Sequence, residues 1–272
     1  MGDRQAKPIR GEGDDTERDP PPERIATAAE RQAPDFIIIG TQRGGTTSMY
    51  RYLCEHPDVG AAFRKEVHFF DDYYDRGLDW YLAHFPKKGE YPLVGEASPF
   101  YLVHPEAPER ARQLVPGARL IALLRDPVAR AWSQYHLKTK RDLEMLPFAE
   151  ALDREEERLA ADPDPVGAAW RHHSYKARGE YAGQLERWFA AFPREQVLVL
   201  KSEDFFADPA REMAGVHRFL GLSPVAGQRY KPYHLADYPP LDPAIDRRLR
   251  DYFAPHNRRL ADLLGRDFGW DA

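Results

Sequence analysis

The sequence predicts an α/β protein with a P-loop-like, three-layer fold, in which a central, mostly parallel sheet is flanked by helices. One observation is that short apolar runs rich in Val, Ile and Leu alternate with longer helix-like segments from Asp35 onward. Continuous apolar strands separated by helices are typical of a parallel sheet covered on both faces. The second observation is the segment 35–48, which has the pattern of a buried strand that enters a glycine-rich turn and then a helix. Ligands of such sheets bind beyond the carboxyl ends of the strands, where this turn would lie.

The expected elements form one domain over residues 34–272. The strands are 36–40, 93–96, 119–124 and 196–201. The helices are 46–56, 78–85, 106–114, 128–140, 148–159, 181–192, 209–220 and 243–264. The helix over 181–192 illustrates the pattern, because Leu185, Trp188 and Phe192 fall on one helical face.

Residues 1–33 are predicted to form a disordered tail, because few large apolar side chains are present to offset the loss of chain entropy. The chain has 39 Lys and Arg against 44 Asp and Glu, a net charge of -5. This balance argues against bulk attraction to nucleic acid or an anionic membrane, although it permits a local basic pocket. The longest apolar runs are too short to span a bilayer, and the N-terminus lacks a signal-peptide pattern. The single cysteine, Cys54, fits a reducing compartment, so a cytoplasmic location is expected.

The glycine-rich loop predicts a phosphate-binding site, because backbone N–H groups at a helix start face the ligand and the helix dipole favours an anion. Gly40, Gly45 and Thr47 fit the frame of a Walker A loop, but Thr46 occupies the lysine position. The cation lies inside the loop instead, as Arg43. A missing lysine argues against ATP or GTP as the ligand. The candidate anion ligands are Arg43, Gly44, Gly45, Thr46, Thr47 and Ser48.

The segment 65–70 contains a carboxylate and an imidazole two residues apart. If the backbone is extended, Glu66 and His68 point to one face while Val67 and Phe69 point to the core. Such a pair is suited to act as a general base with a positioning partner. The competing interpretation is a solvated Lys–Glu pair beside an ordinary hydrogen-bonded histidine.

The segment 119–135 predicts a second anion site. An apolar strand ends at Arg125, Asp126-Pro127 then starts a helix, and Ser133 lies within its first two turns. Arg125 and Ser133 could together bind a further phosphate through a bidentate donor and a hydroxyl. Alternatively, Arg125 pairs with a neighbouring carboxylate and Ser133 is a surface residue.

Taken together, these segments resemble the sulfotransferase family that uses 3′-phosphoadenosine 5′-phosphosulfate (PAPS), in particular its carbohydrate and heparan-type branch and the bacterial relatives of that branch. The strongest matching stretches are 38–48, 56–57, 65–71 and 123–135. Weaker matches occur at 178–181, 197–203, 219–222 and 268–270. The resemblance therefore covers about residues 35–270, and it implies that 34–272 is a sulfotransferase domain.

The resemblance also implies roles for the candidate residues. The loop 43–48 would hold the 5′-phosphosulfate of PAPS, with Arg43 contributing to catalysis at the sulfate, and Arg125 with Ser133 would bind the 3′-phosphate. Glu66 would match the catalytic base and His68 its supporting neighbour. The donor in this family needs no metal, so none is expected here.

The acceptor implied by the resemblance is a hydroxyl group of a carbohydrate or another small molecule. Ala97 stands where heparan-type enzymes often carry a lysine that handles the acceptor, which argues against a heparan-like acceptor. The late Lys-Gly-Arg loop that closes over the donor in several relatives has no clean counterpart, and Lys231 and His234 are the nearest candidates for its role.

Two other functions stay open on the residues alone. A P-loop small-molecule kinase would require a lysine in place of Thr46 and a carboxylate for magnesium, and neither is evident. A non-catalytic nucleotide-binding module would keep Arg43, Arg125 and Ser133 without any need for Glu66.

Overall fold

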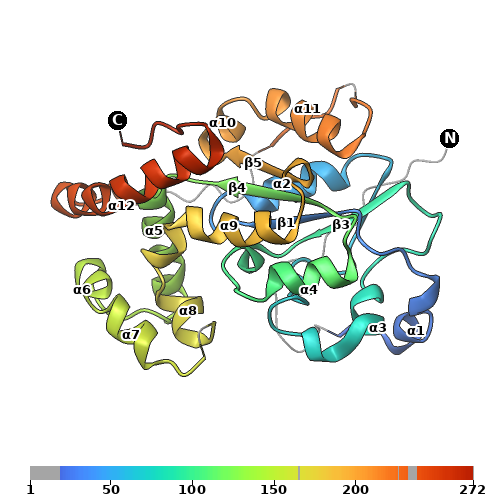
Figure 1. The fold of residues 1–272 in the computed structure, drawn as a ribbon, viewed down its shortest axis with the longest axis horizontal. Coiled ribbons are helices and arrows are strands. Elements are labelled where there is room, and N and C mark those ends of the chain that lie inside the picture. Colours follow the sequence, from blue (N-terminus) through green and yellow to red (C-terminus); the bar gives the residue numbers. More distant parts are fainter. Residues whose placement is uncertain (1–18, 165, 226, 232–237, 272) are drawn as a thin grey trace.

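A five-stranded sheet forms the centre of the computed structural model, which describes residues 19–164, 166–225, 227–231 and 238–271 (Figure 1). All of its strand pairs are parallel, and the strand order is β2-β3-β1-β4-β5. The strands are β1 (Phe36–Gly40), β2 (Val59–Ala61), β3 (Leu93–Ala97), β4 (Arg119–Leu124) and β5 (Val197–Lys201). The predicted α/β fold with a parallel central sheet is thus confirmed. The edge strand β2 was not predicted, because three residues are too few to show a hydrophobic pattern.

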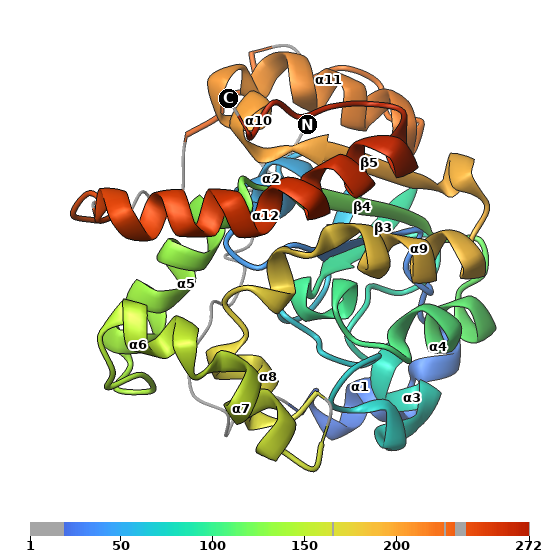
Figure 2. The ribbon, with the colours of Figure 1, turned by 60° about the vertical axis from the view of Figure 1, so that its left-hand side comes forward.

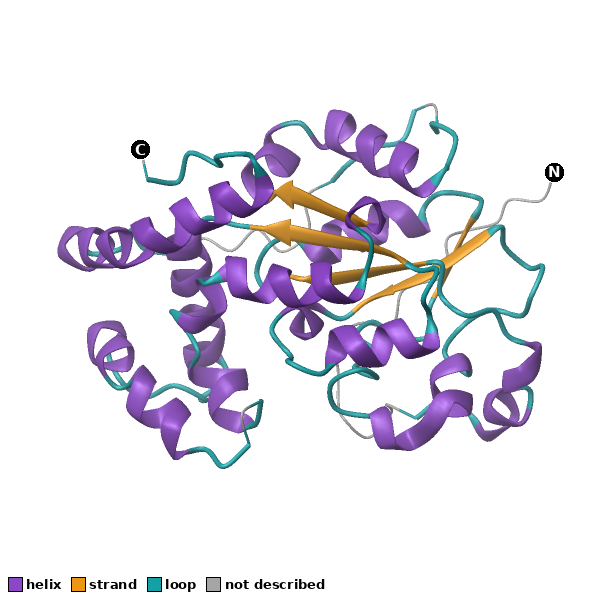
Figure 3. Ribbon diagram, in the orientation of Figure 1, coloured by secondary structure: helices purple, strands orange, loops and turns teal. Residues whose placement is uncertain are grey.

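Helices cover both faces of the sheet, so the molecule has the three layers that the sequence predicts (Figure 3). The helices are α1 (Pro22–Ala26), α2 (Thr46–Cys54), α3 (Gly77–Leu82), α4 (Ala107–Leu114), α5 (Pro127–Lys140), α6 (Phe148–Asp153), α7 (Glu155–Ala161), α8 (Ala168–His173), α9 (Tyr181–Ala191), α10 (Ser202–Ala207), α11 (Pro209–Leu220) and α12 (Pro243–Leu264). Alternate residues of β1 point to opposite layers. Phe36 and Ile38 pack with α2, α10 and α11, whereas Ile37 and Ile39 pack with α3, α4 and α9 (Figures 1 and 2).

The single helix expected over 148–159 was wrong, because α6 and α7 are separate helices that meet at Arg154. At this break Glu155 is buried, and its carboxylate accepts hydrogen bonds from the backbone N–H groups of Lys176 and Ala177. The break therefore accompanies a contact between residues far apart in the chain. Local helical periodicity carries no signal of such a contact.

The predicted disordered tail was too long, since residues 19–33 are folded. Helix α1 and the short 3-10 helix Ala28–Glu30 lie against α3. Arg31 is buried, and its guanidinium donates a hydrogen bond to the carbonyl of Phe85 at 2.8 Å. A polar anchor of this kind explains why the scarcity of apolar residues was misleading. Residues 1–18 lie outside the described part of the chain.

A third cluster of apolar residues lies beyond the carboxyl ends of the strands, where α5 packs with α6 and α12 (Figure 2). Phe148, Tyr175 and Phe253 are among its buried members. This cluster holds α5 in place next to the carboxyl ends of the strands. Within the described ranges, no helix combines the length and the apolar character needed to cross a membrane. The cytoplasmic location stays a prediction.

Candidate active site

A cleft of about 1470 Å³ lies at the carboxyl edge of the sheet. The loop after β1 contributes 42–43 and 45–48, the end of β4 contributes Arg125, and the end of β5 contributes 201–203. Gly44 itself does not line the cleft. Because β1 pairs with β3 on one side and β4 on the other, its loop emerges where the strand order reverses. Open α/β sheets bind their ligands at such a point.

The loop after β1 has the tight geometry expected of an anion-binding turn. A Cβ atom on Gly44 would lie 2.4 Å from the carbonyl oxygen of Leu123, so only glycine fits there. Gly45 has a φ of 99°, a conformation that glycine adopts without strain. Helix α2 begins directly afterwards, and Thr46, Thr47 and Ser48 line the cleft. The N-terminus of a nine-residue helix thus lies at the cleft, where it favours an anion.

The two predicted phosphate sites touch each other. Arg43 donates from Nε to Ser133 Oγ at 2.9 Å and from Nη2 to the Tyr238 hydroxyl at 2.7 Å. Arg125 donates from Nη1 to the carbonyl oxygen of Arg43 at 3.1 Å. Burial lowers the pKa of Arg125, Glu203 opposes this effect and the Arg43 guanidinium adds to it. Burial and the nearby cation both disfavour the bare charge of Arg125, so a bound anion would relieve this unfavourable field.

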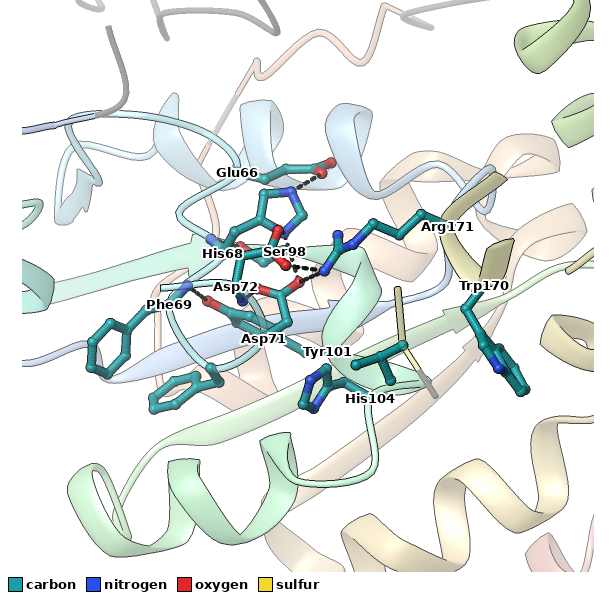
Figure 4. Close-up of polar contacts among 12 residues, drawn as sticks. Glu66, His68, Phe69, Asp71, Asp72, Ser98, Tyr101, His104, Trp170 and Arg171 are labelled. Atoms are coloured by element: carbon teal, nitrogen blue, oxygen red, sulfur yellow. Dashed lines mark hydrogen bonds and ion pairs between the residues drawn. The ribbon is translucent and has the colours of Figure 1, made fainter. Parts of the chain in front are cut away.

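Glu66 and His68 meet in the cleft, as the sequence analysis expected. His68 Nε2 lies 3.1 Å from Glu66 Oε2, and His68 Nδ1 lies 2.7 Å from Asp71 Oδ2 (Figure 4). Lys65 donates from Nζ to Glu66 Oε1 at 2.9 Å. Val67 is buried, again as expected. The backbone is not extended, however, because His68 has a φ of 56° and the segment is a loop.

The charged side chains of Lys65, Glu66, His68 and Asp71 stabilise one another. Burial opposes the ionisation of Glu66, but Lys65 and His68 outweigh it and hold the pKa of Glu66 below its usual range. Burial also opposes protonation of His68, but Asp71 and Glu66 raise its pKa to about 10. Glu66 is therefore a carboxylate and His68 an imidazolium at neutral pH.

The same loop contains the set of side chains that could hold a cation. Ligand atoms of His68, Asp71 and Asp72 lie within 4.8 Å of one another. The guanidinium of Arg171 pairs with Asp72 and lies 4.0 Å from Asp71 Oδ2 (Figure 4). An arginine thus already supplies positive charge to these carboxylates. That the reaction needs no metal stays a prediction.

Basic residues that the sequence analysis did not single out also line the cleft. They are Arg64, Lys138, Arg141, Arg171, Arg178, Lys201 and Arg250, whereas the acidic lining residues are Glu66, Asp72, Asp126 and Glu203. The lining is thus basic although the chain as a whole is acidic. Residues four apart lie on the same face of a helix, so the position of Ser133 could have predicted that Leu137 and Arg141 also line the cleft. Arg171 comes from a distant segment that bears no motif, and Arg178 begins the weakly matching stretch 178–181.

Lys138 is the most unusual of these cations, because its side chain is buried in the cleft wall. Its Nζ lies 3.0 Å from Nδ1 of His172. Burial and the nearby guanidiniums of Arg178, Arg141 and Arg171 lower the pKa of Lys138 to about 7. An anion bound beside Lys138 would restore its charge.

The structure does not place the two candidates for the donor-closing loop, Lys231 and His234, at the cleft. Lys231 is exposed and does not line the cleft, and its carbonyl oxygen accepts a hydrogen bond from the Tyr52 hydroxyl at 2.7 Å. The neighbouring Tyr230 packs edge-on against Tyr52, with ring centroids 5.0 Å apart, which holds Lys231 beside α2. His234 lies outside the described residues. Tyr238, which the sequence analysis missed, contacts Arg43.

Fold and site together define a parallel α/β protein whose anion-binding loop and carboxylate–imidazole pair share one basic cleft. Residues 33–232 match the sulfotransferase domain family, and the chain belongs to this family. The predicted family resemblance is confirmed.

Relatives of known name support this membership. Human heparan sulfate glucosamine 3-O-sulfotransferase 3B1 is 32% identical over 268 residues, which cover 90% of this chain and 66% of the relative. Human heparan sulfate glucosamine 3-O-sulfotransferase 3A1 is 33% identical, with 89% and 63% covered. The chain thus spans about two thirds of the length of these relatives. The crystal structure of a sulfotransferase from Alicyclobacillus acidocaldarius has a TM-score of 0.71 and 32% identity, and covers 89% of this chain and 100% of its own.

Proposed function

We propose that the protein transfers a sulfuryl group from PAPS to a hydroxyl group of an anionic carbohydrate. The observation that carries this proposal is that Glu66 lines the same cleft as Arg43 and residues 45–48 of the anion-binding loop. A base and a phosphate-binding helix start are the two parts that group transfer from a phosphosulfate to an alcohol requires. Membership in the sulfotransferase family supports the same conclusion.

The donor end of the cleft fits a ligand with two separated phosphate groups. In our proposal, the N-terminus of α2 and Arg43 bind the phosphosulfate, and Arg125 with Ser133 binds the 3′-phosphate. Guanidinium groups form charge-assisted, bidentate hydrogen bonds to phosphate oxygens, which suits both positions. Because Arg43 already contacts Ser133, the donor would share or replace that hydrogen bond.

Glu66 is the proposed general base. It accepts the proton of the acceptor hydroxyl as the hydroxyl oxygen bonds to sulfur and the bond from sulfur to the phosphate oxygen breaks. Arg43 and the N–H groups at the start of α2 stabilise the charge that develops on the leaving phosphate. Glu66 is ionised at neutral pH and so is ready to accept a proton. The negative charge of the donor would offset the field of Lys65 and raise the proton affinity of Glu66.

An anionic acceptor is proposed from the charge of the remaining cleft wall. Lys138, Arg171 and Arg178 line it, and Lys138 pairs with no carboxylate among the described residues. Ala97 is buried in β3, so the position where heparan-type relatives often carry a lysine offers no cation. Lys138 supplies one from α5 instead. The relatives named above act, by their names, on heparan sulfate, which is a polyanion.

A transfer assay with labelled PAPS against neutral sugars, sulfated or carboxylated sugars, phenols and lipid alcohols tests the proposal. We expect transfer to anionic sugars above all. Adenosine 3′,5′-bisphosphate (PAP) without magnesium should stabilise the protein, by about 2.7 kcal/mol at 100 times its Kd. Stabilisation only by ATP with magnesium would favour the small-molecule kinase. PAP binding without transfer to any acceptor would favour the non-catalytic module.

A further inference from the structure

Glu96 is a buried carboxyl group to which the proposed mechanism assigns no role. It lies in β3, is fully buried and does not line the cleft. Three hydroxyl groups donate hydrogen bonds to it: Tyr81 at 2.9 Å and Tyr101 at 3.0 Å to Oε1, and Ser98 at 2.6 Å to Oε2. A buried carboxylate that is surrounded by hydroxyl donors and forms no ion pair among the described residues requires an explanation.

Two of these hydroxyls also hold the loop that carries His68. The backbone N–H of His68 donates to Ser98 Oγ at 3.1 Å, and the N–H of Phe69 donates to the Tyr101 hydroxyl at 2.7 Å (Figure 4). His68 has a φ of 56°, a region that residues other than glycine rarely occupy unless the surroundings hold them there. These hydrogen bonds therefore fix the backbone that presents the imidazole to Glu66.

The carboxylate accepts the protons of both hydroxyl groups. An amide N–H can only donate, and a hydroxyl group has a single proton. Since Ser98 and Tyr101 accept from the loop, their own protons must point to an acceptor, and that acceptor is Glu96. An ionised carboxylate accepts at both oxygens, so it satisfies these hydroxyls and Tyr81 together.

We propose that Glu96 is a positioning residue for sulfuryl transfer, which acts through Ser98 and Tyr101 to hold the His68 loop in register with Glu66. The proposal rests on the proposed function only in that the loop serves sulfuryl transfer. Glu96 itself touches neither substrate nor the reacting atoms.

Ionisation of Glu96 makes this positioning dependent on pH. Burial raises the pKa of Glu96 to about 7, although the hydroxyls of Ser98, Tyr81 and Tyr101 oppose the shift. The nearby Asp71 raises it further, and Tyr50 of α2 also faces the carboxyl. Once protonated, Glu96 must donate a hydrogen bond, and one hydroxyl loses its acceptor. The hold on the loop therefore weakens as the pH falls through about 7.

The other groups of the site titrate elsewhere or act on another quantity. The pKa of Glu66 lies below its usual range and that of His68 is about 10. Lys138 titrates at about 7, but as an acceptor-binding cation it changes KM rather than kcat. A fall of kcat below about pH 7 at saturating substrates that depends on the hydroxyl donors of Glu96 is thus the signature of Glu96, because the bound donor can also raise the pKa of Glu66.

Glu96→Gln is the first test, because the amide keeps one acceptor oxygen but replaces the other with a donor. We expect kcat to fall roughly 10- to 100-fold at pH 8, the scale on which a displacement of about 1 Å acts at a reacting centre. The fall of kcat at acidic pH, the acidic limb, should vanish. PAP affinity should stay within about twofold of wild type, because no residue of the proposed donor site moves.

Tyr81→Phe is the matched variant. Within the described part of the chain, Tyr81 donates to Glu96 and makes no hydrogen bond to the loop. Its removal deprives the ionised carboxylate of one donor, so the acidic limb should move to higher pH while kcat above the limb stays close to wild type. Tyr101→Phe, which also breaks the bond to Phe69, should lower kcat across the whole range. A limb that stays in place in Tyr81→Phe would overturn the proposal, even if Glu96→Gln fails to fold.

Hydrogen–deuterium exchange of peptides covering residues 65–72 provides a readout independent of turnover. Faster exchange in Tyr101→Phe and Glu96→Gln, with little change in Tyr81→Phe at pH 8, is expected. Unchanged exchange in all variants would contradict the role of Glu96. If wild-type protein transfers no sulfuryl group to any acceptor, the proposed function fails, and the exchange data still decide whether Glu96 holds the loop.

Discussion

Arg43 donates a hydrogen bond from Nε to Ser133 Oγ at 2.9 Å, and this contact joins the loop after β1 to helix α5. By the family resemblance, the two residues would bind different phosphate groups of one donor. Their contact, with the Tyr238 hydroxyl on the same guanidinium, means that one arginine spans both predicted anion positions. In the proposed function, donor binding and the arrangement of α5 would therefore be coupled through a single side chain.

Replacing Arg43 tests this coupling. Arg43→Ala should lower kcat by about 10²- to 10³-fold, the loss typical for removal of one preorganised donor at the developing charge. Arg43→Lys keeps the charge but replaces the planar fork of donors with a single ammonium on a different stem, so its activity should be intermediate. Tyr238→Phe removes only one partner and is the matched control, with a small effect on PAP affinity measured by calorimetry. Equal activity of Arg43→Lys and wild type would show that the fork geometry is irrelevant.

Glu66→Gln should abolish turnover while PAP binding survives. The amide has nearly the shape of the carboxylate but cannot accept the proton of the acceptor hydroxyl. Sulfuryl transfer and calorimetric PAP binding, measured on the same preparation, separate the two effects. Glu109→Gln makes the same chemical change at an exposed position of α4 and should behave as wild type. Near-normal activity of Glu66→Gln would rule out Glu66 as the base.

Lys138→Met should raise the KM for an anionic acceptor and leave kcat nearly unchanged. Since the pKa of Lys138 is about 7, the side chain is a cation below that pH and neutral above it. Wild-type affinity for the acceptor should therefore fall as the pH rises through about 7, and this dependence should disappear in the variant. Lys140→Met, at an exposed position two residues further along, is the control. If both variants keep the wild-type KM, the basic wall does not bind the acceptor.

Asp71→Asn should flatten the dependence of stability on pH above neutrality. The pKa of His68 in the folded protein is about 10, raised from 6.5, so its protonation stabilises the fold fully below about pH 6.5. This contribution is lost as the pH rises toward 10. Urea unfolding at several pH values gives the free energy of unfolding of wild type and variant. The difference between the two pH profiles isolates the contribution of His68, because other titrating groups contribute to both. An identical pH profile would mean that Asp71 does not hold the proton on His68.

The proposed donor half of the cleft could be predicted from local sequence. Each of its parts, the loop 43–48 and the strand end at Arg125 with Ser133 in the next helix, is contiguous in the chain. A parallel sheet brings the carboxyl ends of its strands to one edge, so these separate motifs had to meet. The meeting of Glu66 and His68 was also predicted, since the two are only two residues apart.

The acceptor half depended on tertiary structure. Lys138, Arg171 and Arg178 form one basic wall only because the packing of α5 against distant helices brings them to the same cleft. No motif marks out Lys138 or Arg171 in a chain of net negative charge, and Arg178 only begins a weakly matching stretch. The folded segment 19–33 was missed for a similar reason, because Arg31 is held by a backbone carbonyl far along the chain.

The sequence alone was sufficient for the layer order, the donor loop and the identity of the proposed base, because these follow from residues close together and from the rules of parallel sheets. Only the folded chain determined the state of that base. Lys65 and His68 set the ionisation of Glu66, and the buried carboxyl of Glu96 orients the hydroxyls that hold the His68 loop. Burial and side-chain contact are properties of three-dimensional packing, and no linear pattern of residues specifies them.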